Sequence, residues 1–213
     1  SSALASVAPD ADAETKIAEE LAELAVGESK YTTLLSALRE VAQRLAGEGL
    51  PRCPPKDVAA LAGALAPLCE LHAELKGAVL AAAGSADRSQ AVAAALGALL
   101  PRCEALYGAY VDQLPFAGAL YEKLADAKGF RPVRRLHDQL CRETGLTNDD
   151  AVSALAAPCR HPAALLLVLR RLLSLTPPAA DGWSALAEVA ERWALFCEAL
   201  DRAKRLADQT QEL

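Results

Sequence analysis

The strongest constraint on the fold is the regular spacing of apolar residues over residues 13–46. Successive apolar positions are separated by four, three, seven, four, three and seven residues: Ile17, Leu21, Leu24, Tyr31, Leu35, Leu38 and Leu45. This spacing is typical of one face of an α-helix. A helix over residues 13–46 extends about 50 Å, which predicts an elongated bundle. The prolines at positions 51, 54 and 55 end the helix.

Similar spacing along the rest of the chain predicts further helices. We expect them over residues 57–83, 90–110, 131–144 and 183–209, with residues 117–127 continuing the third helix after a bend at Pro115. Residues 163–176 are hydrophobic nearly all round, which predicts a buried central helix. Residues 1–11 are small and polar and are expected to form a disordered leader. The predicted fold class is therefore all-α, an elongated single-domain bundle of about six main helices over residues 12–213.

The composition agrees with this fold class and excludes some functions. Hydrophobic residues make up 53% of the chain and aromatic residues only 4%, and abundant alanine and leucine favour helices over strands. The net charge is −6 with no basic block, so nucleic acid is not an expected partner. The longest uncharged apolar run, residues 58–69, is too short to span a membrane. No signal peptide is recognised, so we expect a cytoplasmic protein.

The cysteines and histidines show no catalytic or metal-binding motif. The six cysteines are isolated, which favours free thiols in a reducing compartment over a disulfide framework or metal site. His72, His137 and His161 have no metal-ligand spacing, and no phosphate-binding loop or hydrolase motif is present. We interpret His72 as a residue at the core margin and His137 as a surface residue. The sequence predicts no metal, no cofactor and no covalent catalysis.

Glu28 is out of place in the apolar stripe of residues 13–46. It lies four residues after Leu24 and three before Tyr31. A buried, unpaired carboxylate is strongly unfavourable. Either Glu28 is solvated at the margin of a wide stripe, or this part of the helix faces a partner protein.

Three segments resemble the Dbl-homology family, in the order in which that family has them. The first is KIAEELAELAVGESKYTTLLSAL (residues 16–38), in which Glu28 and Tyr31 match a conserved Glu and Tyr and Gly27 replaces the usual Thr. The second is DVAALAGALAPLCELHAELKGAVL (residues 57–80). The third, PCRHPAALLLVLRRLLSLT (residues 158–176), fits the family's third conserved region without a gap.

The resemblance implies a guanine-nucleotide exchange domain that binds the switch regions of a Rho-family GTPase and promotes GDP release. The GTPase-binding residues it implies are Glu28, Tyr31, Arg160, His161, Ala164 and Asp201. It also implies a pleckstrin-homology domain following the exchange domain in the full-length protein.

Some family positions are altered. Arg160 and His161 replace a Gln-Arg pair, Ala164 replaces a basic residue, and Asp201 falls where the family has Asn. These changes favour an alternative, a catalytically silent Dbl-like scaffold for protein interactions. A third alternative is a helical adaptor unrelated to the family.

Overall fold

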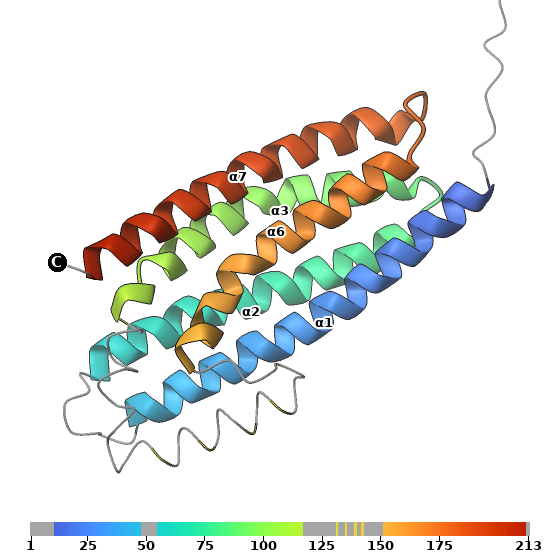
Figure 1. The fold of residues 1–213 in the computed structure, drawn as a ribbon. Coiled ribbons are helices and arrows are strands. Elements are labelled where there is room, and N and C mark those ends of the chain that lie inside the picture. The colour runs from blue at the N-terminus through green and yellow to red at the C-terminus, as the bar shows by residue number, and fades with distance from the viewer. Residues whose placement is uncertain are drawn as a thin grey trace, which may run out of the picture.

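Five helices account for most of the structure, a computed structural model that describes residues 11–47, 55–116 and 151–211 together with Arg131, Arg135, Gln139 and Arg142. The helices are α1 (Ala11–Gly47), α2 (Pro55–Ala83), α3 (Arg88–Val111), α6 (Ala151–Leu175) and α7 (Asp181–Gln211). They run lengthwise beside one another as an elongated bundle (Figure 1). The described residues contain no strand. The predicted all-α class is confirmed.

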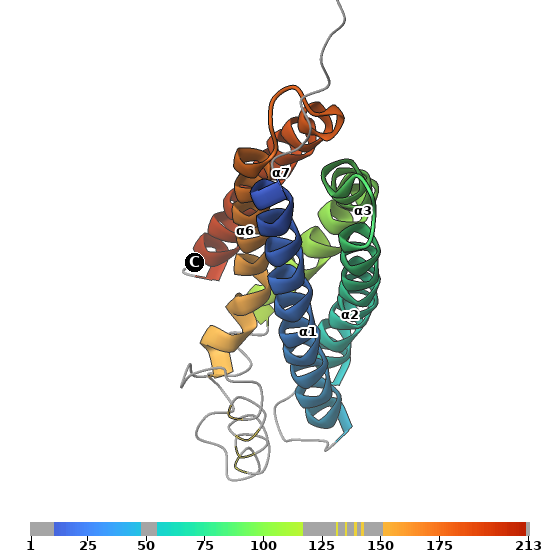
Figure 2. The same cartoon turned by 90° about the vertical axis from the view of Figure 1, so that its right-hand side faces the viewer.

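The helices close a ring around a common core. Each packs against the next in the order α1, α2, α3, α7, α6 and back to α1. Figure 2 shows α2 and α3 on one side of the molecule and α6 and α7 on the other, with α1 between them. The apolar faces line the interior, where α3 also contacts α1 and α6. Polar side chains from α1, α2 and α6 can therefore meet inside the ring.

The stripe predicted over residues 13–46 is the buried face of α1. Ile17, Leu21, Leu24, Tyr31 and Leu35 are all buried. The 37 residues of α1 extend about 55 Å, so this helix runs much of the length of the bundle. The predicted helix boundaries for α1, α2 and α7 agree with the structure to within two residues.

Helix α6 begins earlier than the sequence predicts. Residues 163–176 were expected to form this helix, because Pro158 and Pro162 were placed before it. The helix instead starts at Ala151 and contains both prolines. A proline inside a helix removes the bond from its own nitrogen to the carbonyl four residues earlier. Their spacing of four places Pro162 above the carbonyl of Pro158, and both side chains are buried, so packing compensates for the lost bonds.

The expected burial of α6 applies to one face of the helix. Leu165, Leu169 and Leu172 are buried in the core, whereas Leu167 is 58% exposed. Arg170 and Arg171, which lie between Leu169 and Leu172 in the sequence, are exposed. Because α6 is a member of the ring, with neighbours α1 and α7 on its two sides, it also has an outer surface.

Other predictions concern residues outside the described part of the chain. These are the leader at residues 1–10, the continuation at residues 117–127 and most of the helix at residues 131–144. Ala11, the last residue assigned to the leader, is the first residue of α1. None of the helices in the described part is long and apolar enough to cross a membrane.

Candidate functional site

Glu28 lies inside the helical ring, in the middle of α1. Its side chain is fully buried. The interpretation of Glu28 as a solvated residue at the margin of the stripe is therefore wrong. The periodicity was correct, and the carboxylate follows the same face as Leu24 and Tyr31 into the interior. Burial of a carboxylate there requires partners that the linear pattern did not identify.

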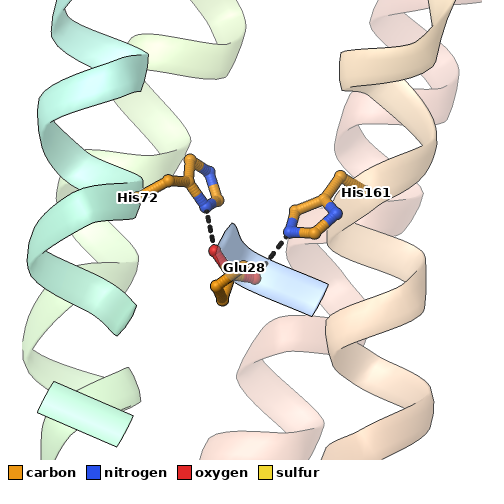
Figure 3. A group of neighbouring side chains, drawn as sticks. All are labelled: Glu28, His72 and His161. Atoms are coloured by element: carbon orange, nitrogen blue, oxygen red, sulfur yellow. Dashed lines mark hydrogen bonds and ion pairs between the residues drawn. The ribbon is translucent and has the colours of Figure 1, made fainter. Parts of the chain in front are cut away.

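Two histidines from other helices supply those partners. Nδ1 of His72, on α2, lies 2.8 Å from Oε2 of Glu28, and Nε2 of His161, on α6, lies 2.7 Å from Oε1. Figure 3 shows the carboxylate between the two imidazoles, one from each side. Each carboxylate oxygen therefore has one imidazole partner.

The charges of this group follow from its hydrogen bonds. Burial raises the pKa of Glu28, but the hydrogen bonds from His161 and His72 outweigh it, so the net pKa lies below the ordinary value. Glu28 is therefore ionised at neutral pH. An ionised carboxylate only accepts hydrogen bonds, so both facing imidazole nitrogens carry their hydrogen and donate it.

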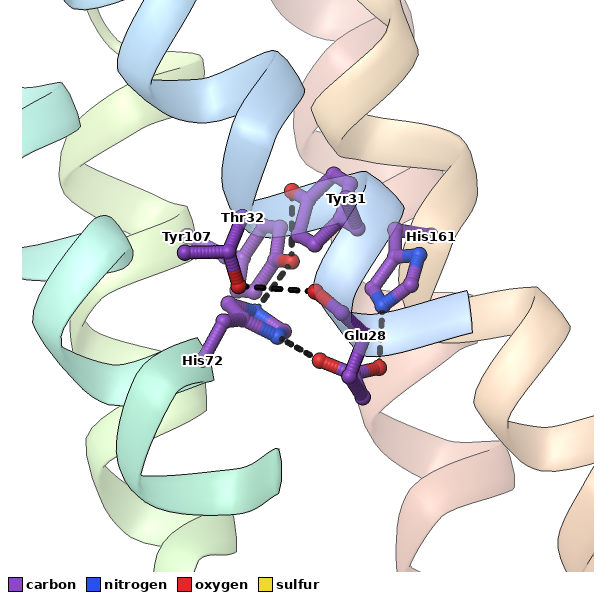
Figure 4. Close-up of polar contacts among 6 residues, drawn as sticks. All are labelled: Glu28, Tyr31, Thr32, His72, Tyr107 and His161. Atoms are coloured by element: carbon purple, nitrogen blue, oxygen red, sulfur yellow. Dashed lines mark hydrogen bonds and ion pairs between the residues drawn. The ribbon is translucent and has the colours of Figure 1, made fainter. Parts of the chain in front are cut away.

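A pair of tyrosines extends the network from His72. Burial lowers the pKa of His72 and outweighs the opposing effect of Glu28, so this imidazole is neutral and its Nε2 accepts. The hydroxyl of Tyr107, on α3, lies 2.9 Å from that Nε2, and the Tyr31 hydroxyl lies 2.9 Å from the Tyr107 hydroxyl. The donors therefore run from Tyr31 to Tyr107, to His72 and to Glu28 (Figure 4). All four side chains have satisfied hydrogen bonds.

His161 connects this buried group to the surface. Its ring stacks on Tyr31 with centroids 3.6 Å apart and planes inclined by 7°. Its side chain is 15% exposed, whereas those of Glu28 and His72 are fully buried. Solvent or a ligand therefore reaches the carboxylate most directly past His161.

The remaining predicted site residues are exposed on α6 and α7. Arg160 and Ala164 lie on α6 on either side of His161 in sequence. Asp201 is exposed on α7 and pairs with Arg205, with 2.8 Å between Oδ2 and Nη2. A cleft of about 310 Å³ lies between parts of the two helices and is lined by Ala163, Asp201 and Lys204 among others. The structure thus unites Glu28, Tyr31 and His161 in one contact network, with exposed residues beside it.

Sequence reasoning missed the partners of Glu28, although a signal was present. His72 is fully buried, so its interpretation as a residue at the core margin is wrong. It lies four residues after Leu68 and three before Leu75, in the apolar stripe of α2, and Tyr107 is at equivalent spacing from Cys103 and Tyr110 in α3. Polar residues at core positions of three helices are expected to pair with one another. The separations of 44 and 133 residues to Glu28 hide that pairing from any local motif.

The same group contains atoms that can ligate a metal. One ligand atom from each of Glu28, His72 and His161 lies within 4.8 Å of the others. The sequence predicted no metal site, because no two histidines have a metal-ligand spacing. The fold brings two of them to one carboxylate nevertheless. Among the described cysteines, Cys69, Cys103, Cys159 and Cys197 are free thiols.

Comparison with known proteins identifies the fold. No family model matches the sequence, and no curated protein matches it. Among solved structures, the DH domain of FARP2 aligns with a TM-score of 0.71 and 15% identity over 92% of this chain and 94% of that chain. The DH/PH domain of human ARHGEF11, in a ternary complex with human RhoA and its inhibitor, aligns with a TM-score of 0.77 and 17% identity, covering 95% of this chain and 57% of that chain.

Vav1 gives the same result. The activated truncation of Vav1 aligns with a TM-score of 0.74 and 17% identity over 92% of this chain. This chain spans 49% of that Vav1 chain and almost all of the FARP2 DH domain. The likeness therefore corresponds to the DH unit of these larger proteins. On the helical ring and on these structural matches, the chain has the fold of a Dbl-homology domain.

Proposed function

We propose that the chain is a guanine-nucleotide exchange domain that binds the switch regions of a Rho-family GTPase and promotes GDP release. The observation that carries this proposal is the likeness over 95% of the chain to the ARHGEF11 DH/PH domain, which is in complex with RhoA. The resemblance of the first and third conserved regions supports it independently, since those segments form neighbouring helices α1 and α6.

The proposed GTPase-binding face combines α1, α6 and α7. Glu28 and Tyr31 come from α1, Arg160, His161 and Ala164 from α6, and Asp201 from α7. Exchange requires no covalent step, because a domain that binds the nucleotide-free GTPase more tightly than the GDP-bound form lowers the affinity for GDP. The exposed residues make the first contacts in this proposal. Glu28 makes its contact only after the imidazole of His161 has moved.

The burial of Glu28 favours a second candidate, a Dbl-like scaffold without exchange activity. In the unbound protein both oxygens of Glu28 are occupied by imidazoles. A GTPase must replace at least one of these charge-assisted hydrogen bonds, each worth about 1.5–3 kcal/mol. If the GTPase does not compensate for that loss, it docks on α6 and α7 without release of its nucleotide.

Two measurements separate the candidates. The first is release of fluorescent GDP from a panel of Rho-family GTPases in the presence of the domain. The second is capture of the same GTPases by the immobilised domain after their nucleotide has been removed. Accelerated release from one GTPase supports exchange, whereas capture without acceleration supports the scaffold. If GDP release is accelerated for no member of the panel and no member is captured, both candidates are refuted for Rho-family GTPases.

A charge change on the exposed face locates the docking surface. Asp201→Lys reverses the charge of an exposed residue on α7 and is expected to weaken capture or release. Glu74→Lys is the matched control, because Glu74 is an exposed residue of α2, paired with Arg102 of α3, and α2 lies on the other side of α1 from α6 and α7 (Figure 2). Equal effects of the two substitutions would place docking elsewhere.

A further inference from the structure

Glu28, His72 and His161 form a donor set of a kind that proteins use for transition metals. Two imidazoles and one carboxylate are the protein ligands of several zinc sites and of non-haem iron sites. Here they come from α2, α6 and α1, and one ligand atom of each lies within 4.8 Å of the others. We propose that these three side chains bind a divalent transition-metal ion of the zinc type inside the helical ring.

The distances in the structure are close to those that a metal requires. The facing nitrogens lie 2.8 Å and 2.7 Å from the Glu28 oxygens. In a tetrahedral zinc site with bonds of about 2.0–2.1 Å, neighbouring ligand atoms are about 3.3 Å apart. Each nitrogen–oxygen distance therefore widens by about half an ångström when an ion enters. Because the three ligand atoms lie within 4.8 Å of one another, we expect side-chain rotation of Glu28 and of the two histidines to bring them onto one ion.

The surroundings provide the outer hydrogen bonds of a metal site. A ligating histidine ordinarily donates its other ring N–H to a nearby acceptor, which fixes the orientation of its ring. Nε2 of His72 faces the Tyr107 hydroxyl at 2.9 Å. With a metal on Nδ1, the hydrogen of His72 lies on Nε2 and is donated to Tyr107, whose own hydroxyl then donates to Tyr31. Because either tyrosine oxygen can donate, the pair serves both tautomers.

The charge and the accessibility of the site are consistent with a bound cation. Glu28 is the one carboxylate among the three ligands, and its negative charge lies in the interior without an ammonium or guanidinium partner in the hydrogen bonds that hold it. A divalent ion compensates that charge directly. His161 is partly exposed, so we expect the ion to enter past it and water to supply a fourth ligand from that side.

A bound ion has a consequence for the GTPase site, and this consequence rests on the proposed function. The metal and the GTPase compete for the carboxylate of Glu28. Zinc is therefore expected to slow GDP release by a domain that is active in its metal-free form. The site itself is testable without a GTPase, so failure of the metal site and failure of the exchange function are distinguishable.

The test uses the full chain, stripped of metal with a chelator that is then removed, and cobalt(II) as a spectroscopic probe. We expect one equivalent of cobalt to bind and to give the strong visible absorption of tetrahedral coordination. Zinc should displace it and raise the unfolding temperature. His161→Ala, which removes the most exposed ligand, is expected to weaken binding at least about tenfold while the domain remains folded by circular dichroism.

The chain offers a matched control in its third histidine, His137. His137→Ala should bind cobalt as the wild type does. Glu28→Gln, which keeps the shape of the side chain, should also lose binding. Three outcomes overturn the proposal: no saturable cobalt binding, equal loss in His137→Ala and His161→Ala, or the near-ultraviolet absorption of cobalt–thiolate coordination, which assigns the metal to cysteines.

Discussion

At the scale of single residues, Glu28 illustrates how a buried charge is made acceptable by exact pairing. It has two imidazole donors. The other ring nitrogen of His72 bonds to the Tyr107 hydroxyl, which in turn bonds to the Tyr31 hydroxyl. A closed network of this kind is favourable only while every member is present. Removal of one member leaves another polar group unsatisfied in the core.

Glu28→Leu should therefore destabilise the fold in the metal-free protein. The substitution introduces an apolar side chain of similar size and leaves the facing N–H groups of His72 and His161 without an acceptor. We expect a loss of about 2 kcal/mol or more in the free energy of unfolding, measured by urea denaturation. Glu23→Leu, at an exposed position of the same helix, should change it by no more than about 0.5 kcal/mol. Equal losses would show that the network contributes no stability.

The buried thiol of Cys103 should make the free energy of unfolding depend on pH in the alkaline range. Burial raises its pKa from 9.0 to about 12, with a smaller contribution from the charge of Glu28. The unfolded thiol therefore releases its proton near pH 9 while the folded thiol keeps it, so stability falls as pH rises above 9. At pH 10 this single group accounts for a loss of about 1.4 kcal/mol. The difference in unfolding free energy between pH 8 and pH 10 should be smaller by that amount in Cys103→Ala; an unchanged difference contradicts the shift.

The sequence showed that Glu28 was unusual but not how it was accommodated. Its place in the stripe with Leu24 and Tyr31 follows from helical periodicity, which is local. The identity of its partners depends on how α1, α2 and α6 are arranged in space. These partners, His72 and His161, lie 44 and 133 residues from Glu28 in the sequence. No spacing rule connects positions so far apart.

At the scale of elements, the beginnings of α3 and α7 approach each other closely at Gly182. A Cβ atom added to Gly182 would lie 2.6 Å from the backbone nitrogen of Gln90 and 2.7 Å from Cβ of Ser89. The Ser89 hydroxyl also forms a buried hydrogen bond of 2.8 Å with that of Thr176. Backbone atoms on the facing helix leave no side chain that can rotate away.

Gly182→Ala should force these helices apart and destabilise the protein by about 1–3 kcal/mol. The measurement is the midpoint of thermal or urea unfolding. Gly77→Ala is the control, because no atom lies within 4 Å of its added Cβ on α2. Alanine is the better helix former there, so this change should stabilise by about 0.5–1 kcal/mol. Stabilisation by both substitutions would contradict the close approach.

Helix α6 supplies a second test at this scale, since neighbouring leucines have opposite environments. Leu169 is fully buried and Leu167 is 58% exposed. Leu169→Asp places a charge in the core and should abolish cooperative unfolding, followed by circular dichroism, whereas Leu167→Asp should melt nearly as the wild type does. A normal melt of Leu169→Asp would refute the assigned packing face.

The sequence predicted these elements unequally. For α1, α2 and α7 the apolar stripes predict existence and limits to within two residues, even though α2 begins at Pro55 and contains Pro67. For α6 the predicted start was wrong, because Pro158 and Pro162 were placed before the helix but are buried within it. Proline disfavours a helix interior locally, but tertiary packing can outweigh that local preference.

At the scale of the whole molecule, the ring brings the first and third family-like segments together. The segments of α1 and α6 that resemble the Dbl-homology family meet at Glu28 and His161, and α7 adds Asp201 next to the cleft. The family resemblance predicted this fold from segment order and spacing. It could not predict that His161 covers the carboxylate, because His161 is an altered family position that lies 133 residues from Glu28 in the sequence.

We propose that Glu28 promotes GDP release from a Rho-family GTPase after the imidazole of His161 has moved aside for the partner. The most direct test is the rate of fluorescent GDP release from the GTPase identified by the panel, with metal-free wild-type domain, Glu28→Gln and Glu74→Gln. We expect acceleration by wild type and by Glu74→Gln. For Glu28→Gln we expect the rate to fall roughly tenfold or more, because one charge-assisted hydrogen bond is worth about 1.5–3 kcal/mol. Equal rates for wild type and a folded Glu28→Gln would contradict it.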